Sequence, residues 1–274
     1  RIGFYLKNKK KIKFIVKEEL PDALFISSPP PSFLLIGKYL KEQLGLKWIA
    51  DFRDPWVDAF WEKNNNRINF LQKKVEKLEK VVIESADKIS CVSPAITQSF
   101  ATKLNNPKKV HTIYNGFDAD DFKTSKGKSN ATKFRMSFIG GLGKSQICVS
   151  FFRALSELPE ILKNKIEVKF IGNIHQEVDQ LVQHFKLQNV VFIEGYQPHK
   201  YVINRINNSE LLLLFIARKT GEGVISGKFF EYLATGNEIL SVVDGSNKNL
   251  HDLITVCNAG VMKQYDDNFY TYIS

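Results

Sequence analysis

The sequence predicts an α/β protein made of two Rossmann-like domains, each a parallel β-sheet covered by helices. Short apolar runs rich in β-branched residues alternate with longer amphipathic stretches along most of the chain, which is the pattern of strand–helix–strand units. Several short runs are apolar at consecutive positions, as strands covered on both faces of a sheet are. A polar stretch at 119–133, ADDFKTSKGKSNATK, separates two sets of these units.

Nine short runs are expected to form strands. They lie at 23–27, 47–52, 88–93, 109–114, 134–140, 166–172, 190–195, 210–216 and 238–243. The stretches between them are expected to form helices at 33–44, 62–86, 94–104, 148–163, 175–187, 199–208, 227–235 and 247–256. We therefore expect an N-terminal domain at 1–125 and a C-terminal domain at 126–274, with a cleft between them. The first has about four strands where doubly wound domains have about six, so we expect it to be incomplete.

Composition narrows the class of protein. Of the 274 residues, 43% are hydrophobic and 25% are charged, which is typical of a globular chain. The odd number of cysteines (Cys91, Cys148 and Cys257) and their scattered positions indicate a reducing compartment without disulfides.

Neither the cysteines nor the five histidines show metal-ligand spacing, and we expect no metal. No apolar run approaches the roughly 20 residues that a membrane span needs, and no signal peptide is present, so a cytoplasmic protein is expected.

Positive charge is concentrated at the start of the chain. The net charge is +10, and residues 1–20 hold seven Lys or Arg and two Glu. Two interpretations remain open, a solvated basic face and contact with an anionic membrane surface. Nucleic-acid binding is not favoured, because aromatic residues do not interleave with the basic ones as in oligonucleotide-binding surfaces.

Two glycine-containing turns precede predicted helices in the second half. FIGGLGK at 138–144 places glycines and Lys144 directly after a strand, but it fits neither the dinucleotide-binding nor the P-loop spacing. GEGVISGKFFEYLATG at 221–236 carries Lys228 and Glu231 at the start of a helix, with Ser226 as its expected N-cap. The structural interpretation is a tight turn and a well-formed helix start. The functional interpretation is a diphosphate held by loop amides and Lys228, with Glu231 on ribose hydroxyls.

A third polar group, DFRDPW at 51–56, also follows a predicted strand. Asp51, Arg53 and Asp54 would lie at the carboxyl end of a sheet, where ligands of α/β proteins bind. A salt-bridged turn closed by Pro55 is the alternative.

Together these stretches resemble the group 1 glycosyltransferases, that is glycosyltransferase family 4 with the GT-B architecture. The resembling pieces follow the family's order and are PDALFISSPP (21–30), ADFRDPW (50–56), SADKISCVSPAITQSF (85–100), IYNGFD (113–118), FIGGLGK (138–144), VVFIEGYQP (190–198) and GVISGKFFEYLATGNEIL (223–240). DFRDPW and SGKFFEYLATG look most like the branch that builds bacterial surface polysaccharides.

The resemblance implies a retaining transfer of a sugar from a nucleotide diphosphate, UDP being expected, to a carbohydrate or lipid-linked acceptor. No cofactor is implied beyond this donor substrate. The donor would be held by Gly140, Gly141, Lys144, Val224, Ile225, Ser226, Lys228 and Glu231. Asp51, Arg53 and Asp54 would line the acceptor side.

The chain departs from the family pattern at several points. Position 223 is Gly where the first of two paired glutamates is expected, and Glu222 lies one residue earlier. Gly141 stands where an arginine is frequent, and the family's N-terminal glycine-rich loop and final C-terminal helix are missing. The chain begins with Arg1 and is expected to be part of a longer one. A sugar-nucleotide epimerase of the same architecture and a degenerate binding or assembly protein therefore remain as alternatives.

Overall fold

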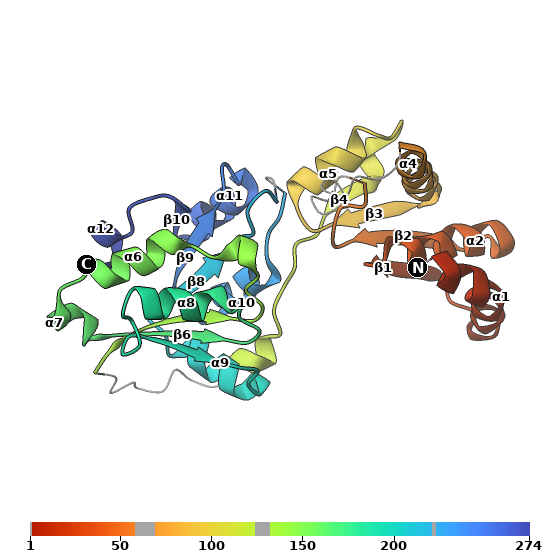
Figure 1. Cartoon of the computed structure of the whole chain (residues 1–274). Coiled ribbons are helices and arrows are strands. Elements are labelled where there is room, and N and C mark those ends of the chain that lie inside the picture. Colours follow the sequence, from red (N-terminus) through yellow and green to blue (C-terminus); the bar gives the residue numbers. More distant parts are fainter. Residues whose placement is uncertain (1, 58–68, 124–131, 221–222) are drawn as a thin grey trace. The chain divides into compact units, whose positions relative to one another are not determined.

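The computed structural model describes residues 2–57, 69–123, 132–220 and 223–274. It contains two compact units, Arg1–Tyr114 and Asn115–Ser274, each built around one parallel sheet (Figure 1). The prediction of two Rossmann-like α/β domains is confirmed. None of the described helices is long and apolar enough to cross a lipid bilayer.

The first unit contains a four-stranded sheet in the order β1-β2-β3-β4. Its elements are α1 (Ile2–Glu19), β1 (Ala23–Ser28), the 3-10 helix η1 (Pro31–Phe33), α2 (Leu34–Leu44), β2 (Lys47–Phe52), α4 (Asn69–Ser85), β3 (Lys88–Cys91), α5 (Pro94–Ala101), η2 (Pro107–Lys109) and β4 (Val110–Thr112). All neighbouring strands are parallel. Because each strand is added on the same side of the previous one, right-handed crossovers place α2, α4 and α5 on one face. These helices and the sheet share one apolar cluster around Trp48, Phe52 and Phe100.

The second unit contains a six-stranded parallel sheet in the order β10-β9-β8-β5-β6-β7. Its elements are η3 (Ala119–Phe122), β5 (Phe134–Ile139), η4 (Lys144–Gln146), α6 (Val149–Glu157), α7 (Glu160–Lys163), β6 (Ile166–Ile171), α8 (Glu177–His184), β7 (Val191–Glu194), α9 (His199–Asn207), β8 (Leu211–Phe215), α10 (Gly227–Thr235), β9 (Glu238–Val243), α11 (Lys248–Cys257), β10 (Gly260–Gln264) and α12 (Tyr270–Ile273). This is the doubly wound strand order, and its direction reverses between β5 and β8.

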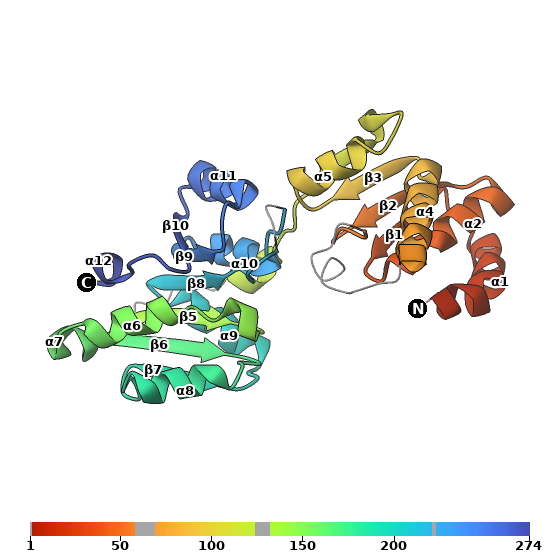
Figure 2. The same cartoon turned by 45° about the horizontal axis from the view of Figure 1, so that its top comes forward.

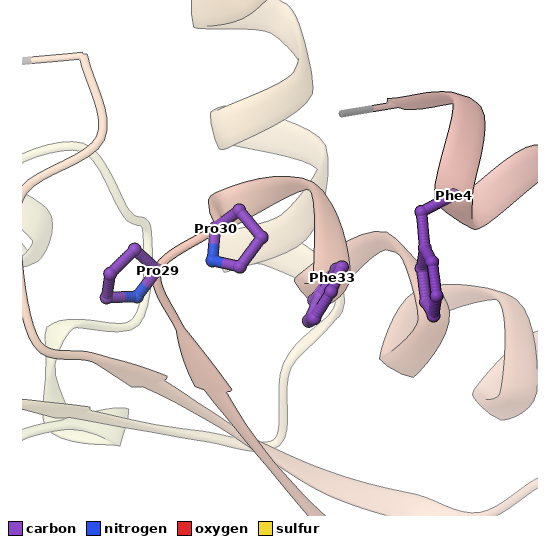
Figure 3. A pocket seen from close by; sticks show the side chains of 4 residues that line it. All are labelled: Phe4, Pro29, Pro30 and Phe33. Atoms are coloured by element: carbon purple, nitrogen blue, oxygen red, sulfur yellow. The ribbon is translucent and has the colours of Figure 1, made fainter.

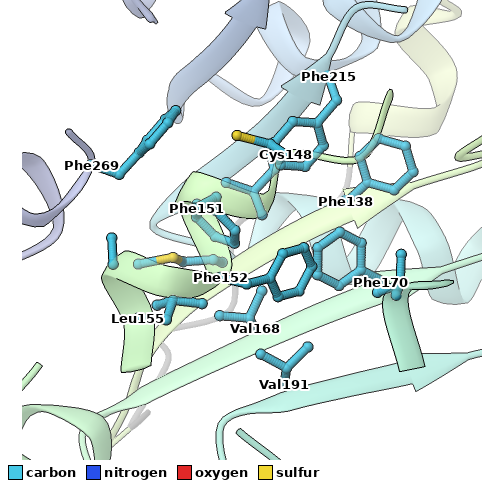
Figure 4. Packing of buried hydrophobic residues seen from close by; sticks show 14 of the residues in the cluster. Phe138, Cys148, Phe151, Phe152, Leu155, Val168, Phe170, Val191, Phe215 and Phe269 are labelled. Carbon is cyan, nitrogen blue, oxygen red and sulfur yellow. The ribbon is translucent and has the colours of Figure 1, made fainter. Parts of the chain in front are cut away.

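Helices cover both faces of the second sheet (Figure 2). On one face, α6, α8 and α12 pack on an aromatic core that includes Phe138, Phe151, Phe170 and Phe215 (Figure 4). On the other face, α9, α10 and α11 form a second apolar cluster with β8 and β9. Consecutive residues of β8 are all buried because the strand is central and its side chains enter both clusters.

The nine predicted strands are all present, most of them shortened by one or more residues. The single helix predicted at 148–163 is wrong. It divides into α6 and α7 because Pro159 has no amide hydrogen and Leu158 before it is extended, with ψ of 146°. Helix α1, strand β10 and helix α12 were not predicted. Residues 62–68 of the predicted helix 62–86 and 124–131 of the predicted linker lie outside the described residues.

Candidate functional site

The point where strand order reverses in the second unit is held together by side chains. Strands β5 and β8 pair only through Met136 with Leu211 and Ser137 with Leu212. Beyond these pairs, the hydroxyl of Tyr232 accepts a hydrogen bond from the Ile139 amide and donates one to the Leu213 carbonyl, both at 3.2 Å. Helix α10 therefore links the carboxyl end of β5 to the middle of β8, beside the edge where doubly wound sheets bind ligands.

The loop after β5 is tied to the end of β8 by a second bridge. The Gln146 side chain donates from Nε2 to the Phe215 carbonyl at 2.8 Å, and its Oε1 accepts from the Gly143 amide at 2.9 Å. The loop that begins at Gly140 is thus anchored at its far end as well.

Gly140 and Gly172 allow two loops to approach each other closely. Gly140 has φ of +86° and Gly172 has φ of +127°, both in the region that favours glycine. A Cβ atom on Gly172 would lie 2.4 Å from the Gly140 carbonyl oxygen, and one on Gly140 would lie 2.7 Å from Cε of Lys228. The backbone conformation therefore explains the glycine at the end of β5. The absence of a side chain at Gly140 also leaves room for the Lys228 side chain.

Lys228 lies against this turn. Its Nζ donates to the Gly141 carbonyl oxygen at 3.1 Å and stands 4.2 Å from the centroid of the Phe138 ring. Burial lowers the pKa of Lys228 to about 8, and the nearby Glu231 carboxylate opposes this shift. A partly desolvated ammonium group beside a glycine turn is suited to binding an anion, because the anion restores the electrostatic stabilisation that water would give.

Glu231 belongs to a charged cluster with His199 and Asp121. His199, the first residue of α9, places Nε2 2.7 Å from Oδ2 of Asp121 in η3. Burial raises the pKa of Glu231, while the charges of His199 and Lys228 lower it. The hydrogen bond that the protonated His199 donates to the Asp121 carboxylate raises the pKa of His199. Glu231 is therefore a half-buried acceptor with cationic neighbours.

The remaining predicted donor residues differ in their surroundings. Lys144 is 75% exposed, and its Nζ lies 3.4 Å from Oε2 of Glu177 at the start of α8. Ile225 is in the apolar core, and the Val224 carbonyl accepts from the Asn247 side chain at 2.9 Å. Ser226 is the N-cap of α10 by position, but its side chain makes no capping hydrogen bond. The Ser226 side chain thus does not cap the α10 N-terminus, which is the positive end of the helix dipole.

The acceptor-side candidates lie in the first unit, at the end of β2. The Asp51 carboxylate accepts from the Ser27 hydroxyl at Oδ2 and from the Ser90 hydroxyl at Oδ1, both at 2.7 Å. It is only 6% exposed. The Arg53 amide donates to the Ser28 carbonyl at 3.2 Å. Burial raises the pKa of Asp54, and the Arg53 charge opposes this.

The structure brings together Gly140, Gly141, Lys228 and Glu231, and it places Lys144 on the side of the loop that faces α8. Sequence reasoning missed Tyr232 and Gln146, which hold the loop, and the pairing of His199 with Asp121. The pair could not be predicted from the sequence, because Asp121 lies in the polar stretch at 119–133 that was interpreted as a linker. His175, which lies just before α8, accepts a hydrogen bond at Nδ1 from the Glu177 amide in the first turn of that helix, at 3.2 Å.

Within the described residues, no three His, Cys, Asp or Glu side chains are grouped as a metal site. Cys91, Cys148 and Cys257 are free thiols, as expected. Glu222, considered as a shifted first glutamate of the paired motif, lies outside the described residues.

The comparisons with known proteins agree with this architecture. Residues 1–121 match the model of Glycosyltransferase Family 4. No curated protein matches the chain.

Solved structures share its fold at low sequence identity. The chain is similar to HepE of Anabaena, solved with UDP and glucose, at 14% identity and a TM-score of 0.62 over 91% of this chain and 71% of that one. It is similar to WaaG, a glycosyltransferase involved in lipopolysaccharide biosynthesis, at 12% identity and a TM-score of 0.61 over 88% and 72%. It is also similar to a protein of Listeria monocytogenes described as a UDP-N-acetylglucosamine 2-epimerase, at 11% identity and a TM-score of 0.61 over 99% and 70%.

The match over residues 1–121 and the fold shared with HepE and with the glycosyltransferase WaaG confirm the resemblance to the group 1 glycosyltransferases, and this chain has their GT-B type of fold.

Proposed function

We propose that this protein is a glycosyltransferase whose second unit binds a nucleotide-diphosphate sugar at the carboxyl ends of β5 and β8. One observation carries the proposal: the Gly140–Gly141 turn, the Lys228 ammonium group and Glu231 adjoin the N-terminus of α10. Such a turn and helix end offer amide donors and positive potential to a diphosphate. Glu231 has the acceptor oxygens that the hydroxyls of a ribose need.

The chemistry assigned to this site is electrostatic. When the bond between the anomeric carbon and the diphosphate oxygen breaks, the electron pair goes to the leaving nucleotide diphosphate. Lys228, the loop amides and the α10 N-terminus stabilise that charge, the acceptor hydroxyl supplies the oxygen of the new bond, and its proton passes to an oxygen of the leaving diphosphate. Lys144 is more exposed and can join the diphosphate by leaving Glu177. We assign no metal and no further cofactor to this step.

The first unit is assigned to the acceptor. Asp51 is held by two serines and is proposed to orient the end of β2, while Arg53 and Asp54 face the acceptor. We propose a carbohydrate or lipid-linked acceptor, retention at the anomeric carbon and a role in bacterial surface-polysaccharide synthesis. The last point is supported by the fold shared with WaaG. UDP is the proposed nucleotide, as in the HepE complex. We place the protein in the cytoplasm, at the inner face of the membrane.

Nucleotide binding tests the proposal. Thermal unfolding of the full chain should be measured with UDP, GDP, CDP, ADP and dTDP, since a ligand that binds only the native state raises its stability. We expect UDP to raise the unfolding temperature of the wild type and to lose most of this effect in Glu231→Gln. Glu157→Gln, at an exposed position of α6, is the matched control and should respond as the wild type. If no nucleotide stabilises the wild type, the donor-site assignment is wrong.

A sugar-nucleotide epimerase is the second candidate, favoured by the fold shared with the Listeria protein. An epimerase would convert UDP-N-acetylglucosamine without any acceptor, whereas a transferase needs one. Incubation with this donor alone, followed by separation of the epimeric sugars, distinguishes the two. A degenerate binding protein, suggested by Gly223, would bind UDP and would leave every donor and acceptor unchanged.

A further inference from the structure

The first unit contains an apolar pocket that no role described so far uses. It has a volume of about 420 Å³ and is lined by Phe4, Pro29, Pro30 and Phe33 (Figure 3). Phe4 comes from the first turn of α1, and the other three follow the carboxyl end of β1. The Phe4 and Phe33 rings are 4.8 Å apart between centroids. A sugar would find no hydrogen-bonding side chain on these walls, whereas a hydrocarbon chain would lose only its contact with water.

The outer face of α1 continues from this pocket as a basic and aromatic stripe. Phe4, Lys7, Lys11 and Phe14 follow one another at spacings of three and four residues, so their side chains lie along one side of the helix. All four are exposed, with Phe4 at 47% and Phe14 at 65%. The α1 acidic residues, Glu18 and Glu19, are at the opposite end of the helix.

The inner face of α1 is occupied by α2. The Tyr5 ring meets the Tyr39 ring edge-on at 6.4 Å, and the Lys13 ammonium group donates to Oε1 of Gln43 at 2.9 Å. These contacts fix the rotation of α1 about its axis. The stripe therefore stays outward, and Lys7 remains within one helical turn of the pocket residue Phe4.

The pocket also adjoins the proposed acceptor side of the same unit. Ser28 precedes Pro29, and its carbonyl accepts from the Arg53 amide at 3.2 Å. Among the described residues, the buried hydroxyls of Ser28 and Ser32 have no hydrogen-bond partner. The segment that lines the pocket thus joins an apolar wall to polar groups and to the DFRDPW turn.

We propose that this pocket binds the hydrocarbon chain of an anionic lipid, an alkyl or prenyl phosphate, with Lys7 and Lys11 on its phosphate group. The pairing of an apolar cavity with a row of ammonium groups complements a molecule that has an apolar chain and an anionic head. This inference rests on the proposed transferase function, for which it selects a lipid-linked acceptor over a free saccharide.

Isothermal titration calorimetry of the full chain with farnesyl phosphate below its aggregation concentration tests the proposal. We expect saturable binding of one molecule per chain, binding at least tenfold weaker for farnesol, and no heat with inorganic phosphate. Phe4→Ser and the double variant Lys7→Glu, Lys11→Glu should each weaken binding of farnesyl phosphate at least tenfold. Phe33→Trp, which fills the cavity, should weaken it similarly.

Two variants serve as matched controls. Ile161→Ser removes an apolar side chain that is 68% exposed in the second unit, and Lys108→Glu reverses an exposed charge elsewhere in the first unit. Both should bind farnesyl phosphate as the wild type does. Absence of binding to the wild type, or binding by Phe4→Ser and Phe33→Trp as tight as that of the wild type, would overturn the proposal. Stabilisation by UDP, measured on the same proteins, separates this failure from a failure of the transferase assignment.

Discussion

The ammonium group of Lys228 donates a hydrogen bond to the Gly141 carbonyl at 3.1 Å while it lies 4.2 Å from the Phe138 ring centroid. A carbonyl oxygen and an aromatic face are weaker partners for a cation than a phosphate is. The site thus holds a cation that burial destabilises and that an anionic ligand would stabilise.

Replacing Lys228 should therefore have opposite effects on the stability of the ligand-free protein and on its affinity for UDP. Lys228→Met is expected to raise the unfolding temperature of the ligand-free protein, because a desolvated charge is removed. It should weaken UDP binding by roughly 10- to 100-fold, since a hydrogen bond to a charged group contributes about 1.5–3 kcal/mol. Thermal unfolding with and without UDP measures both effects. Lys165→Met, at an exposed position, is the control, and a loss of stability in Lys228→Met would contradict this account.

The pH dependence of UDP binding should follow the same lysine. Its pKa of about 8 means that the ammonium form is lost from the free protein above this pH. UDP affinity is expected to stay level from pH 7 to 8 and then to fall, by up to about tenfold per pH unit. Because unfolding restores the usual lysine pKa, this group alone makes the ligand-free protein more stable as pH rises from 8 to 10. Titration calorimetry across this range measures the affinity, and Lys228→Met should remove the decline.

The two close-packed glycines should not tolerate a methyl group. Gly172→Ala forces φ of +127° on a residue with a Cβ atom and creates a 2.4 Å contact with Gly140. A loss of about 1–3 kcal/mol in the free energy of unfolding is expected. Gly195→Ala is the matched control, because it follows the adjacent strand β7 and its added Cβ meets nothing within 4 Å. Urea unfolding compares the two, and equal stabilities would show that the close approach is not required.

Removal of the Tyr232 hydroxyl should lower both the free energy of unfolding and the affinity for UDP. Tyr232→Phe keeps the buried ring but leaves the Ile139 amide and the Leu213 carbonyl without this partner, at a cost of about 1–3 kcal/mol. UDP binding should weaken as well, since the end of β5 loses its bridge to the middle of β8. Tyr196→Phe, at a side chain that is 92% exposed, should change neither quantity.

The pair formed by His199 and Asp121 should give a pH-dependent contribution to stability. The hydrogen bond raises the pKa of His199, so the contribution is complete below the unfolded-state pKa of about 6.5 and is lost as pH rises through the folded-state value. NMR titration of the imidazole should show the raised pKa, and Asp121→Asn should return it toward the usual value. Asp120→Asn, whose carboxylate pairs with Lys123 instead, should leave the imidazole pKa unchanged.

The sequence predicted the elements whose residues form a clear local pattern, and it missed those without one. Strands such as β8 were predictable because burial on both faces makes every residue apolar. Strand β10 was not, since it lies at the sheet edge, is half-buried throughout and carries Lys263 and Gln264. The lysines of α1 likewise interrupt any apolar period.

The candidate site divides in the same way. Gly140, Lys228 and Glu231 were visible because local chemistry explains them. Tyr232 bonds to a residue 93 positions away, Gln146 to one 69 positions away and His199 to one 78 positions away. No local pattern encodes these contacts.

The Asp51 carboxylate, shared by Ser27 of β1 and Ser90 of β3, has a consequence for assembly of the first sheet. These three residues stand opposite one another in the strand alignment. A shift of either flanking strand by one position would turn its serine to the other side and deprive the buried carboxyl group of one of its two hydrogen-bond donors. Parallel strands far apart in sequence lack a hairpin turn that would set their register. The two hydrogen bonds to Asp51 therefore favour one register for all three strands.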